Sequence, residues 1–325
     1  MGHHFVNQLQ DRDHIKGDIY QLTECSVRTN KNGGLYLQLI LSDKTGGITA
    51  RRWNATEDLA EQFHVGDFVY VDGAVQIFNN SLQMIVTDID KADTSRLDLS
   101  IYLRESQINV PELTGRLKKL FGTLTNPDLI NLADCFLADE KFMTKFCQAP
   151  AGIKIHHNYE GGLLEHTVAM MEMARAVSAI HPRKIDAELL LMGTFLHDIG
   201  KTEELTTQSG VHLYTDTGQL LSHLVLGIGL LERKISEAER LSDEEFPEQT
   251  ALALKHMIVS HHGEREKGSP CVPMTIEAIA LHFIDSLDSK VNEFHRVIHD
   301  DLNRGSDWTE YNAPLQRRLY KRGAE

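Results

Sequence analysis

Short runs in which apolar and polar residues partly alternate dominate the first 95 positions of the chain. The runs are rich in Val, Ile, Leu, Tyr and Thr, and such β-prone runs with alternating polarity are typical of strands. They cover residues 15–29, 34–43, 46–53, 67–78 and 82–92. Clusters of Asn, Gly, Lys, Thr and Ser, which favour turns, separate several of them. The pattern predicts a small β-rich domain.

A helix-sized segment separates the third run from the fourth. Residues 55–63, with the sequence ATEDLAEQF, have a composition that favours a helix. Three strands, a short helix and two further strands suggest a five-stranded barrel of the OB type, which we predict for residues 1–95. A generic β-sandwich and a protein-interaction barrel are the alternatives.

The spacing of apolar residues changes to that of helices from Pro111 onward. In several segments apolar residues recur near i, i+3, i+4 and i+7. The expected helical segments span 111–124, 126–139, 140–150, 162–180, 187–200, 218–241, 248–262 and 274–302. We therefore predict an all-α bundle over residues 111–325. Residues 96–110 would form a connection that packs on one of the two domains.

Length and composition agree with a two-domain protein that works in the cytoplasm and has no membrane partner. A chain of 325 residues exceeds one typical domain. It contains no run of about 18 apolar residues, and its N-terminus lacks the apolar core of a signal peptide. The four cysteines are scattered without a CxxC pair, which argues against a disulfide framework or a zinc ribbon.

The histidines are concentrated in the predicted helical region. Thirteen of the seventeen fall between His156 and His299. Among them, His166 opens a predicted helix after a glycine turn, and His197 stands with Asp198 at the end of the almost wholly apolar segment LMGTFLHDIG. A helix that apolar is buried, and a carboxylate at its end is costly unless a cation neutralises it. The pattern indicates a metal site.

Further histidines and a carboxylate extend this set along the chain. His223, the pair His261 and His262, and Asp285 are each polar residues in an apolar helical surround. Imidazole mixed with carboxylate suits transition metals, with Mn as the first choice and Fe, Ni, Co or Zn as alternatives. Because there are six or seven candidate ligands, we expect two divalent ions rather than one. Paired ions stabilise both the attacking and the leaving oxygen at phosphorus, and therefore the pattern favours phosphoester hydrolysis.

These motifs resemble those of the HD superfamily of metal-dependent phosphohydrolases, whose fold is an all-α bundle. The resemblance lies in the order His166, His197-Asp198 and Asp285, to which the two-metal branch adds His223 and His261/His262. More narrowly, HHNYEGGLLEHT, FLHDIGKTEEL, GQLLSHLVLG, SHHGE and HFIDSLDSK behind an OB-like barrel are similar to YhaM-type 3′-to-5′ exoribonucleases. That family also acts on single-stranded DNA. The resemblance covers nearly the whole chain.

The resemblance implies a role for each matching residue. His166, His197, Asp198 and Asp285 would be the core ligands, with Asp198 as the catalytic bridge between the ions. His223 and one or both of His261 and His262 would hold the second ion. Lys201 matches the catalytic lysine placed near the scissile phosphate, where an ammonium stabilises developing charge or assists the leaving group. Its alternative role is that of a lysine near a helix C-terminus, favoured by the helix dipole. Glu165 and Asp288 are candidates for orienting the ligands.

The barrel would bind the substrate of such an enzyme. An OB groove binds a single strand by stacking bases on aromatic rings while basic side chains contact the phosphates. The candidates are Tyr36, Arg51, Trp53 and Phe78. A core role is the alternative for each of them. The net charge of −14 counts against a nucleic-acid partner, although bound cations would invert the local field.

Two other functions remain open from the sequence. One is an HD phosphohydrolase that acts on a small nucleotide, such as a nucleoside triphosphate or a cyclic or alarmone nucleotide, in which case the barrel has no evident task. The other is a non-catalytic regulator that binds nucleic acid and uses the bundle as a scaffold. It would be expected to lack some of the ligands, whereas all of them are present here. The sequence is also compatible with a homo-oligomer.

Overall fold

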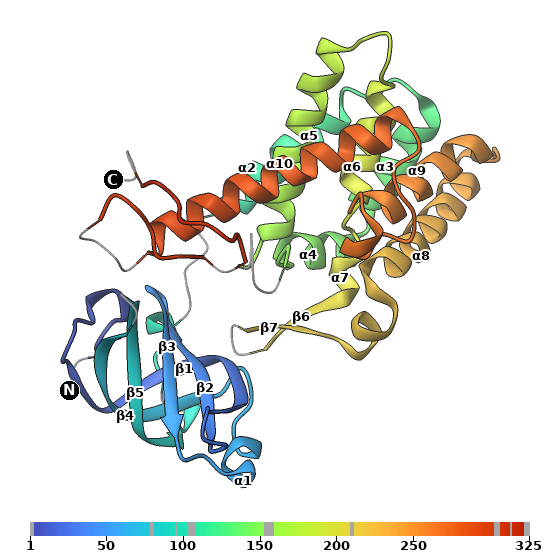
Figure 1. The fold of residues 1–325 in the computed structure, drawn as a ribbon. Coiled ribbons are helices and arrows are strands. Elements are labelled where there is room, and N and C mark those ends of the chain that lie inside the picture. Colours follow the sequence, from blue (N-terminus) through green and yellow to red (C-terminus); the bar gives the residue numbers. More distant parts are fainter. Residues whose placement is uncertain are drawn as a thin grey trace. The chain divides into compact units, whose positions relative to one another are not determined.

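A computed structural model describes residues 3–78, 81–94, 97–102, 108–152, 159–208, 211–301, 306–312 and 314–321. The chain divides into two compact units (Figure 1). The first, called the barrel unit, comprises Met1–Glu105, Gln208–Val211 and Phe294–Glu325. The second, called the helical unit, comprises Ser106–Thr207 and His212–Glu293.

The described N-terminal part of the barrel unit contains five strands and one short α-helix. The strands are β1 (His14–Thr29), β2 (Leu35–Asp43), β3 (Gly46–Trp53), β4 (Phe68–Phe78) and β5 (Ser81–Lys91). Helix α1 (Glu57–Glu61) lies between β3 and β4 in the chain, and the Thr56 side chain caps its N-terminus. The predicted order of three strands, a helix and two strands is confirmed.

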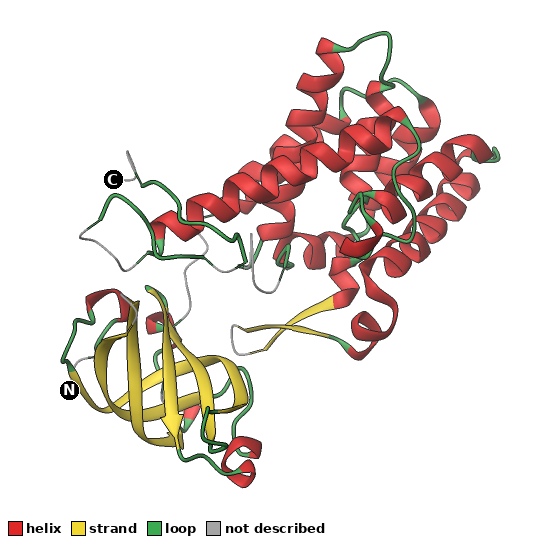
Figure 2. Cartoon of the chain, viewed as in Figure 1, coloured by secondary structure: helices red, strands yellow, loops and turns green. Residues whose placement is uncertain are grey.

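The five strands close into a barrel (Figure 2). Their order is β1-β2-β3-β5-β4, with β4 pairing back onto β1. Neighbouring strands are antiparallel except β3 and β5, whose parallel pairing completes the barrel. Alternate side chains of β2, at Leu37, Leu39 and Leu41, are fully buried. The alternation seen in the sequence thus reflects one strand face that points into a closed core, and the prediction of an OB-type barrel is confirmed.

The described residues of the helical unit form nine α-helices, drawn in red in Figure 2. They are α2 (Val110–Phe121), α3 (Pro127–Ala138), α4 (Glu140–Gln148), α5 (Gly162–Ile180), α6 (Ala187–Leu196), α7 (Lys201–Glu204), α8 (Asp216–Ser242), α9 (Glu248–Ser260) and α10 (Ile276–His299). The last six residues of α10, from Phe294 onward, group with the barrel unit. Asparagine or aspartate side chains cap α2, α3, α4 and α6, because their oxygens accept the otherwise unpaired N–H groups of the first turn.

The core of the helical unit surrounds α6. Five apolar residues and one threonine among its ten residues are at most 4% exposed. The ring of Phe195 makes edge-on contacts with the rings of Phe121 and Phe136. Neighbouring α5 contributes fully buried Leu163, Leu164 and Val168 to the same core. The end of α6 is therefore fixed inside the unit, and the two residues that follow it are held away from water.

Two glycines let the segments around α7 approach α8 closely. A Cβ on Gly200 would lie 2.0 Å from the carbonyl oxygen of His223 and 2.7 Å from the amide nitrogen of Gly227. A Cβ on Gly218 would lie 2.3 Å from the carbonyl oxygen of Glu204. No L side chain fits either position without a shift of the backbone, so both glycines are required for α8 to pack here.

The structure differs from the predicted pattern in the region before α8. Two short strands, β6 (Leu205–Gln208) and β7 (Val211–Tyr214), pair with each other, although the sequence pattern predicted only helices after Pro111. Helix α8 also has a break at Ser222, whose φ of 57° is unusual for a residue with a side chain. Four-residue strands and single-residue breaks are too short to leave a periodic signal.

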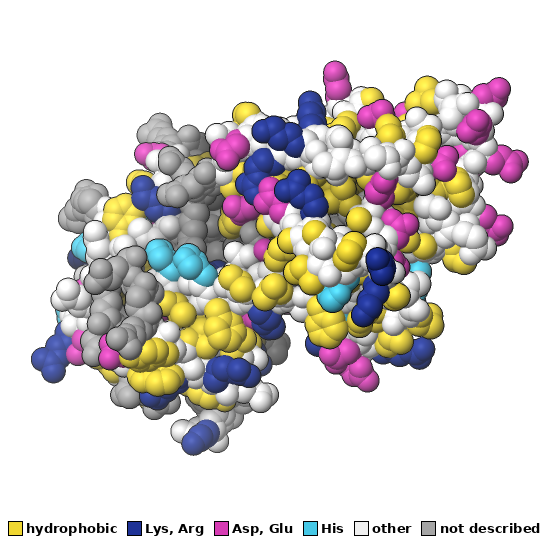
Figure 3. Space-filling model, turned by 90° about the horizontal axis from the view of Figure 1, so that it is seen from above, with side chains coloured by type: hydrophobic (Ala, Val, Ile, Leu, Met, Phe, Trp, Pro, Cys, Tyr) yellow, Lys and Arg dark blue, Asp and Glu magenta, His cyan; other side chains and the backbone are white. Residues whose placement is uncertain are grey.

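One face of the molecule is mixed in charge. On the face drawn in Figure 3, acidic and basic side chains are interspersed among apolar ones. Among the described helices, none is long and apolar enough to cross a lipid bilayer.

Candidate metal centre

His166 occupies the first turn of α5 and is fully buried. Gly161, with a φ of 83°, makes the left-handed turn that starts the helix. The ring Nδ1 of His166 lies 2.7 Å from Asp288 Oδ2, and its Nε2 lies 3.5 Å from Asp285 Oδ1. Burial opposes a charge on the ring, but the hydrogen bonds to both carboxylates outweigh it and raise the pKa of His166 to about 9. Two carboxylates of α10 therefore surround this imidazole.

His197 and Asp198 follow the last residue of α6 and are almost completely buried. His197 Nδ1 donates to the carbonyl oxygen of Thr194 at 2.7 Å, which fixes the ring so that Nε2 lies 3.3 Å from Asp198 Oδ2. One imidazole nitrogen is thus used by the backbone, and the other faces the carboxylate. This is the arrangement that a metal-binding histidine requires.

Three more histidines approach the same carboxylate from α8 and from the end of α9. His223 Nε2 lies 3.5 Å from Asp198 Oδ1, and His261 Nε2 lies 3.6 Å from the same oxygen. The rings of His261 and His262 have centroids 4.3 Å apart. Burial and the neighbouring His197 lower the pKa of His261, while burial and His223 lower that of His262. Neutral imidazoles are the form that binds a metal ion.

The donor atoms form two groups with Asp198 facing both. Ligand atoms of His166, His197 and Asp198 all lie within 4.8 Å of one another, as do those of His223, His261 and His262. Several of the buried donors have no hydrogen-bond partner among the described residues; these are His197 Nε2, Asp198 Oδ1, His223 Nε2 and His262 Nδ1. Buried polar atoms without partners are costly, so the donor set fits divalent ions well.

Lys201 lies beside the same carboxylate. Its Nζ donates to Asp198 Oδ2 at 2.6 Å and to the carbonyl oxygen of Ala151 at 2.6 Å. Burial disfavours both charges, but the Lys201 ammonium holds the pKa of Asp198 well below its usual value, and the Asp198 carboxylate raises the pKa of Lys201. The two groups therefore remain charged in the interior, and the Lys201 ammonium lies next to the candidate metal ligands.

Glu204, at the end of α7, is a further acidic residue of this site that the sequence pattern did not single out. Its Oε1 accepts the backbone N–H of His223 at 2.8 Å and lies 3.0 Å from the ring Nδ1 of the same residue. The side chain is buried, and the nearby His223 lowers the pKa of Glu204 against the effect of burial. The sequence shows Glu204 six residues after Asp198, but no local pattern indicates that its partner is His223.

The other two proposed orienting groups differ in their contacts. Asp288 bonds to His166, as expected of a residue that fixes the ring. Glu165 accepts a short hydrogen bond from the Tyr159 hydroxyl. Residues 156–158 of the motif HHNYEGGLLEHT lie outside the described residues.

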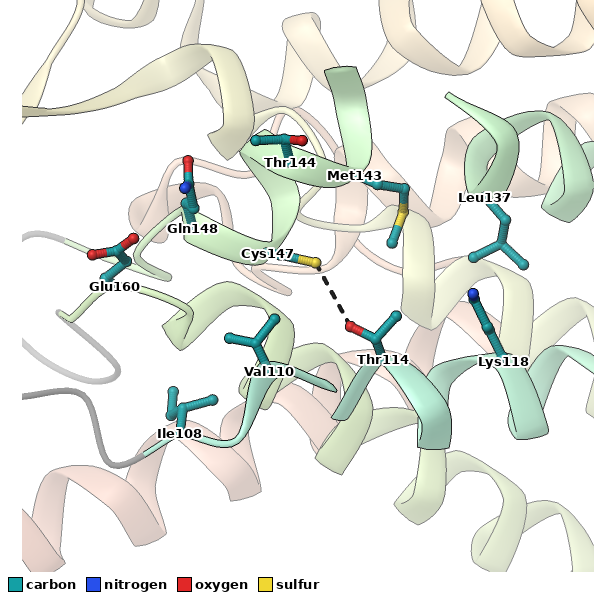
Figure 4. A pocket seen from close by; sticks show the side chains of 10 residues that line it. All are labelled: Ile108, Val110, Thr114, Lys118, Leu137, Met143, Thr144, Cys147, Gln148 and Glu160. Atoms are coloured by element: carbon teal, nitrogen blue, oxygen red, sulfur yellow. Dashed lines mark hydrogen bonds between the residues drawn. The ribbon is translucent and has the colours of Figure 1, made fainter. Parts of the chain in front are cut away.

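A cavity of about 530 Å³ lies elsewhere in the helical unit, between α2 and α4 (Figure 4). Its lining is mainly apolar and includes Val110, Met143 and Cys147, with Lys118 and Glu160 as the charged members. None of the candidate metal ligands lines it. The candidate metal centre is therefore separate from this cavity.

The structure brings the four candidate nucleic-acid contacts into one cluster on the barrel. Tyr36 and Trp53 are direct partners on β2 and β3, with ring centroids 4.8 Å apart. The guanidinium carbon of Arg51 lies 6.0, 5.8 and 5.4 Å from the ring centroids of Tyr36, Trp53 and Phe78, respectively. Phe78 is 47% exposed, and Arg51 Nε has no hydrogen-bond partner among the described residues. Three rings around one cation resemble a binding surface more than a packed core.

Comparison with protein-family models assigns both parts of the chain. Residues 163–290 match the model of the HD domain, and residues 15–92 match that of an OB-fold nucleic acid binding domain. The chain therefore contains an HD domain and an OB-fold domain. The HD domain indicates a metal-dependent phosphohydrolase, and its matched region includes every candidate metal ligand. The OB-fold domain indicates a nucleic-acid-binding function and includes all four residues of the barrel cluster.

Two solved structures are similar in part. The second OB-fold domain of replication protein A from Methanococcus maripaludis is 24% identical, covers 29% of this chain and 98% of its own, and has a TM-score of 0.23. Asparaginyl-tRNA synthetase from Pyrococcus horikoshii is 11% identical over 75% of this chain and 62% of its own, with a TM-score of 0.24. At these scores neither structure carries an argument about function.

Proposed function

We propose that this chain is a metal-dependent 3′-to-5′ exoribonuclease that hydrolyses phosphodiester bonds of single-stranded RNA, with single-stranded DNA as an alternative substrate. The observation that carries the proposal is the position of Asp198, whose two oxygens face His197 on one side and His223 and His261 on the other. The barrel cluster around Arg51 favours a single-stranded nucleic acid over a small nucleotide. The 3′-to-5′ polarity follows from the family resemblance.

The proposed ligands divide between two ions. His166, His197, Asp198 and Asp285 would hold the first ion, whereas His223 and the pair His261/His262 would hold the second, with Asp198 as the bridge. The mixture of imidazole and carboxylate donors suits Mn, Fe, Ni, Co or Zn, and we propose Mn as the first choice. When bound, such ions supply a nucleophilic hydroxide near neutral pH and neutralise charge on the phosphate.

The protein's own groups position the reactants. Backbone carbonyls of Thr194 and Ile258 accept the Nδ1–H of His197 and His261, so that each Nε2 faces the carboxylate of Asp198. The Lys201 ammonium, 2.6 Å from Asp198 Oδ2, would stabilise negative charge on the phosphate as water forms the new P–O bond. The P–O3′ bond would break, and the departing 3′ oxygen would take up a proton.

The decisive experiment uses oligomers labelled at the 5′ end, incubated with the purified protein and Mn²⁺. We expect a ladder of products that shortens from the 3′ end for single-stranded RNA and DNA, with double-stranded substrate resistant. Asp198→Asn keeps the size of the side chain and should abolish the ladder. His181→Gln, an exposed histidine at the end of α5, is the matched control and should leave cleavage intact.

Two outcomes would reject the proposal. Intact oligomers together with turnover of a mononucleotide would indicate the small-nucleotide enzyme. Binding of oligomers without any Mn²⁺-dependent hydrolysis would indicate the non-catalytic regulator.

A further inference from the structure

Helix α10 is apolar on two opposite faces. Its inner face places Ala278, Leu281 and Ile284 against Met170 of α5 and Met257 of α9, and all five are at most 5% exposed. The same face carries Asp285 and Asp288 to His166. This side accounts for the packing of the helix and for its contribution to the metal centre.

The opposite face is also apolar, but the described structure leaves it open. We call this face the outer stripe; it consists of Ile276, Ile279, Phe283, Leu287 and Val291. The residues are 40% to 64% exposed, and their spacing of three or four residues puts them on one side of the helix. Val272 and Met274, just before the helix, are also exposed, by 44% and 71%. An apolar stripe along one side of a helix is normally buried against another part of the protein or a partner.

We propose that the outer stripe is an interface through which two copies of this chain pair. Ile279, Phe283, Leu287 and Val291 form a continuous i, i+4 row, the kind of ridge that packs into the groove of a second helix. A twofold pair requires one self-complementary surface and no second component, and it is the commonest assembly of soluble proteins. This interface is independent of the reaction proposed above.

The area available is sufficient for such a pair. At the observed exposures, the outer stripe with Val272 and Met274 presents on the order of 600 Å² of surface, so pairing of two copies buries roughly 1,200 Å² in total, the lower limit for a specific interface. Isolated apolar residues on a surface need no explanation, but a contiguous patch of this size marks an interaction site.

The charge on this face favours an antiparallel arrangement. Lys290, seven residues after Phe283, lies on the same side of the helix as the outer stripe. Its side chain is 63% exposed and pairs with Glu293 of its own helix. In an antiparallel pair centred between Phe283 and Ile284, the two Lys290 side chains lie about 20 Å apart along the helix axis, whereas a parallel pair would place them side by side. The antiparallel pair also brings the two Phe283 rings to the twofold axis and sets Ile276 opposite Val291.

The mass of the full chain in solution tests the proposal directly. Light scattering coupled to gel filtration should give twice the chain mass of 36.7 kDa for the unaltered protein. The double variant Phe283→Glu with Leu287→Glu should raise the dimer dissociation constant about a hundredfold or more and elute as a monomer. Leu241→Glu and Ile180→Glu change exposed residues on α8 and α5, which are 74% and 72% exposed, and should remain dimeric.

Cross-linking keeps the test valid if the double variant folds poorly. Phe283→Cys should form a disulfide-linked dimer under mild oxidation, visible on a non-reducing gel, whereas Leu241→Cys and the unaltered chain with its four native cysteines should not. A monomeric unaltered chain would overturn the proposal, and would indicate that another part of the chain or another protein covers the stripe. A double variant that is folded and still dimeric would overturn it equally.

Discussion

The backbone nitrogen and the ring Nδ1 of His223 both contact one oxygen, Glu204 Oε1, at 2.8 Å and 3.0 Å, respectively. The backbone donor is available because Ser222 has a φ of 57° and interrupts the helix immediately before His223. One carboxylate thus fixes both the backbone and the ring of this histidine. The remaining ring nitrogen, Nε2, faces Asp198.

This relationship predicts that Glu204→Ala weakens the binding of the proposed second ion. Without the carboxylate, the ring of His223 loses its fixed orientation, and loss of such a partner typically costs 10- to 100-fold in metal affinity. Titration of the protein with Mn²⁺, followed by electron paramagnetic resonance of the free ion, measures the effect. Glu203→Ala, the adjacent residue on α7, is the control, because Glu203 pairs with Arg233 outside the donor set. Equal affinities for the two variants would contradict the prediction.

The close approach at Gly200 predicts a large loss of stability for Gly200→Ala. The added methyl group would lie 2.0 Å from the His223 carbonyl oxygen, which forces the backbones apart and costs about 3 kcal/mol. Urea unfolding followed by circular dichroism measures the change. Gly115→Ala is the matched control: its Cβ meets nothing within 4 Å, and removal of a glycine from the interior of α2 should stabilise the chain by about 0.5 kcal/mol. Equal stabilities of the two variants would refute the steric argument.

The barrel cluster predicts that Trp53→Ala weakens the binding of single-stranded RNA by about tenfold or more, since each stacked base contributes about 1 to 3 kcal/mol. Arg51→Ala should show a similar loss and a weaker dependence on salt. Fluorescence anisotropy with an RNA oligomer measures both, in an Asp198→Asn background that prevents cleavage. Tyr70→Ala removes another exposed aromatic ring of the barrel, 42% exposed, and should bind normally. A loss of equal size for Tyr70→Ala would argue against a specific stacking surface.

His3 predicts a pH dependence of barrel stability. The ring bonds to Asp18 and Asp43 at 3.0 Å each; burial opposes its charge, but these bonds prevail and raise the pKa of His3 to about 9 from 6.5. A raised pKa means that the stabilisation is complete below pH 6.5 and is lost as the pH rises through about 9. At pH 7 we expect His3→Gln to cost about 2 kcal/mol, with little difference between the variant and the unaltered chain at pH 10.

Thermal unfolding monitored by Trp53 and Trp308 fluorescence tests this, because both tryptophans belong to the barrel unit. His64→Gln, whose side chain is 74% exposed, is the control and should behave like the unaltered chain at every pH. Parallel melting curves of His3→Gln and the unaltered chain across this pH range would show that the charged His3 does not stabilise the barrel.

The sequence by itself determined the fold class and the residue types of the candidate metal centre. Alternation along Leu37, Leu39 and Leu41 is a local property, because successive side chains of a strand point to opposite faces, and it therefore identified a barrel strand without knowledge of its partners. The polar pair His197-Asp198 at the end of an apolar helix was equally local, since such a helix must be buried whatever surrounds it.

Only the tertiary structure decided which distant residues meet. Glu204 and His223 are 19 residues apart, and their contact depends on two glycines that let α8 approach α7. Arg51 and Phe78 come from strands that are not adjacent in the barrel, so their contact follows from the closure of the sheet. The open outer face of α10 looks like core in the sequence, because periodicity shows that a face is apolar but not what covers it. Such contacts result from packing between segments, and no pattern within a single segment encodes them.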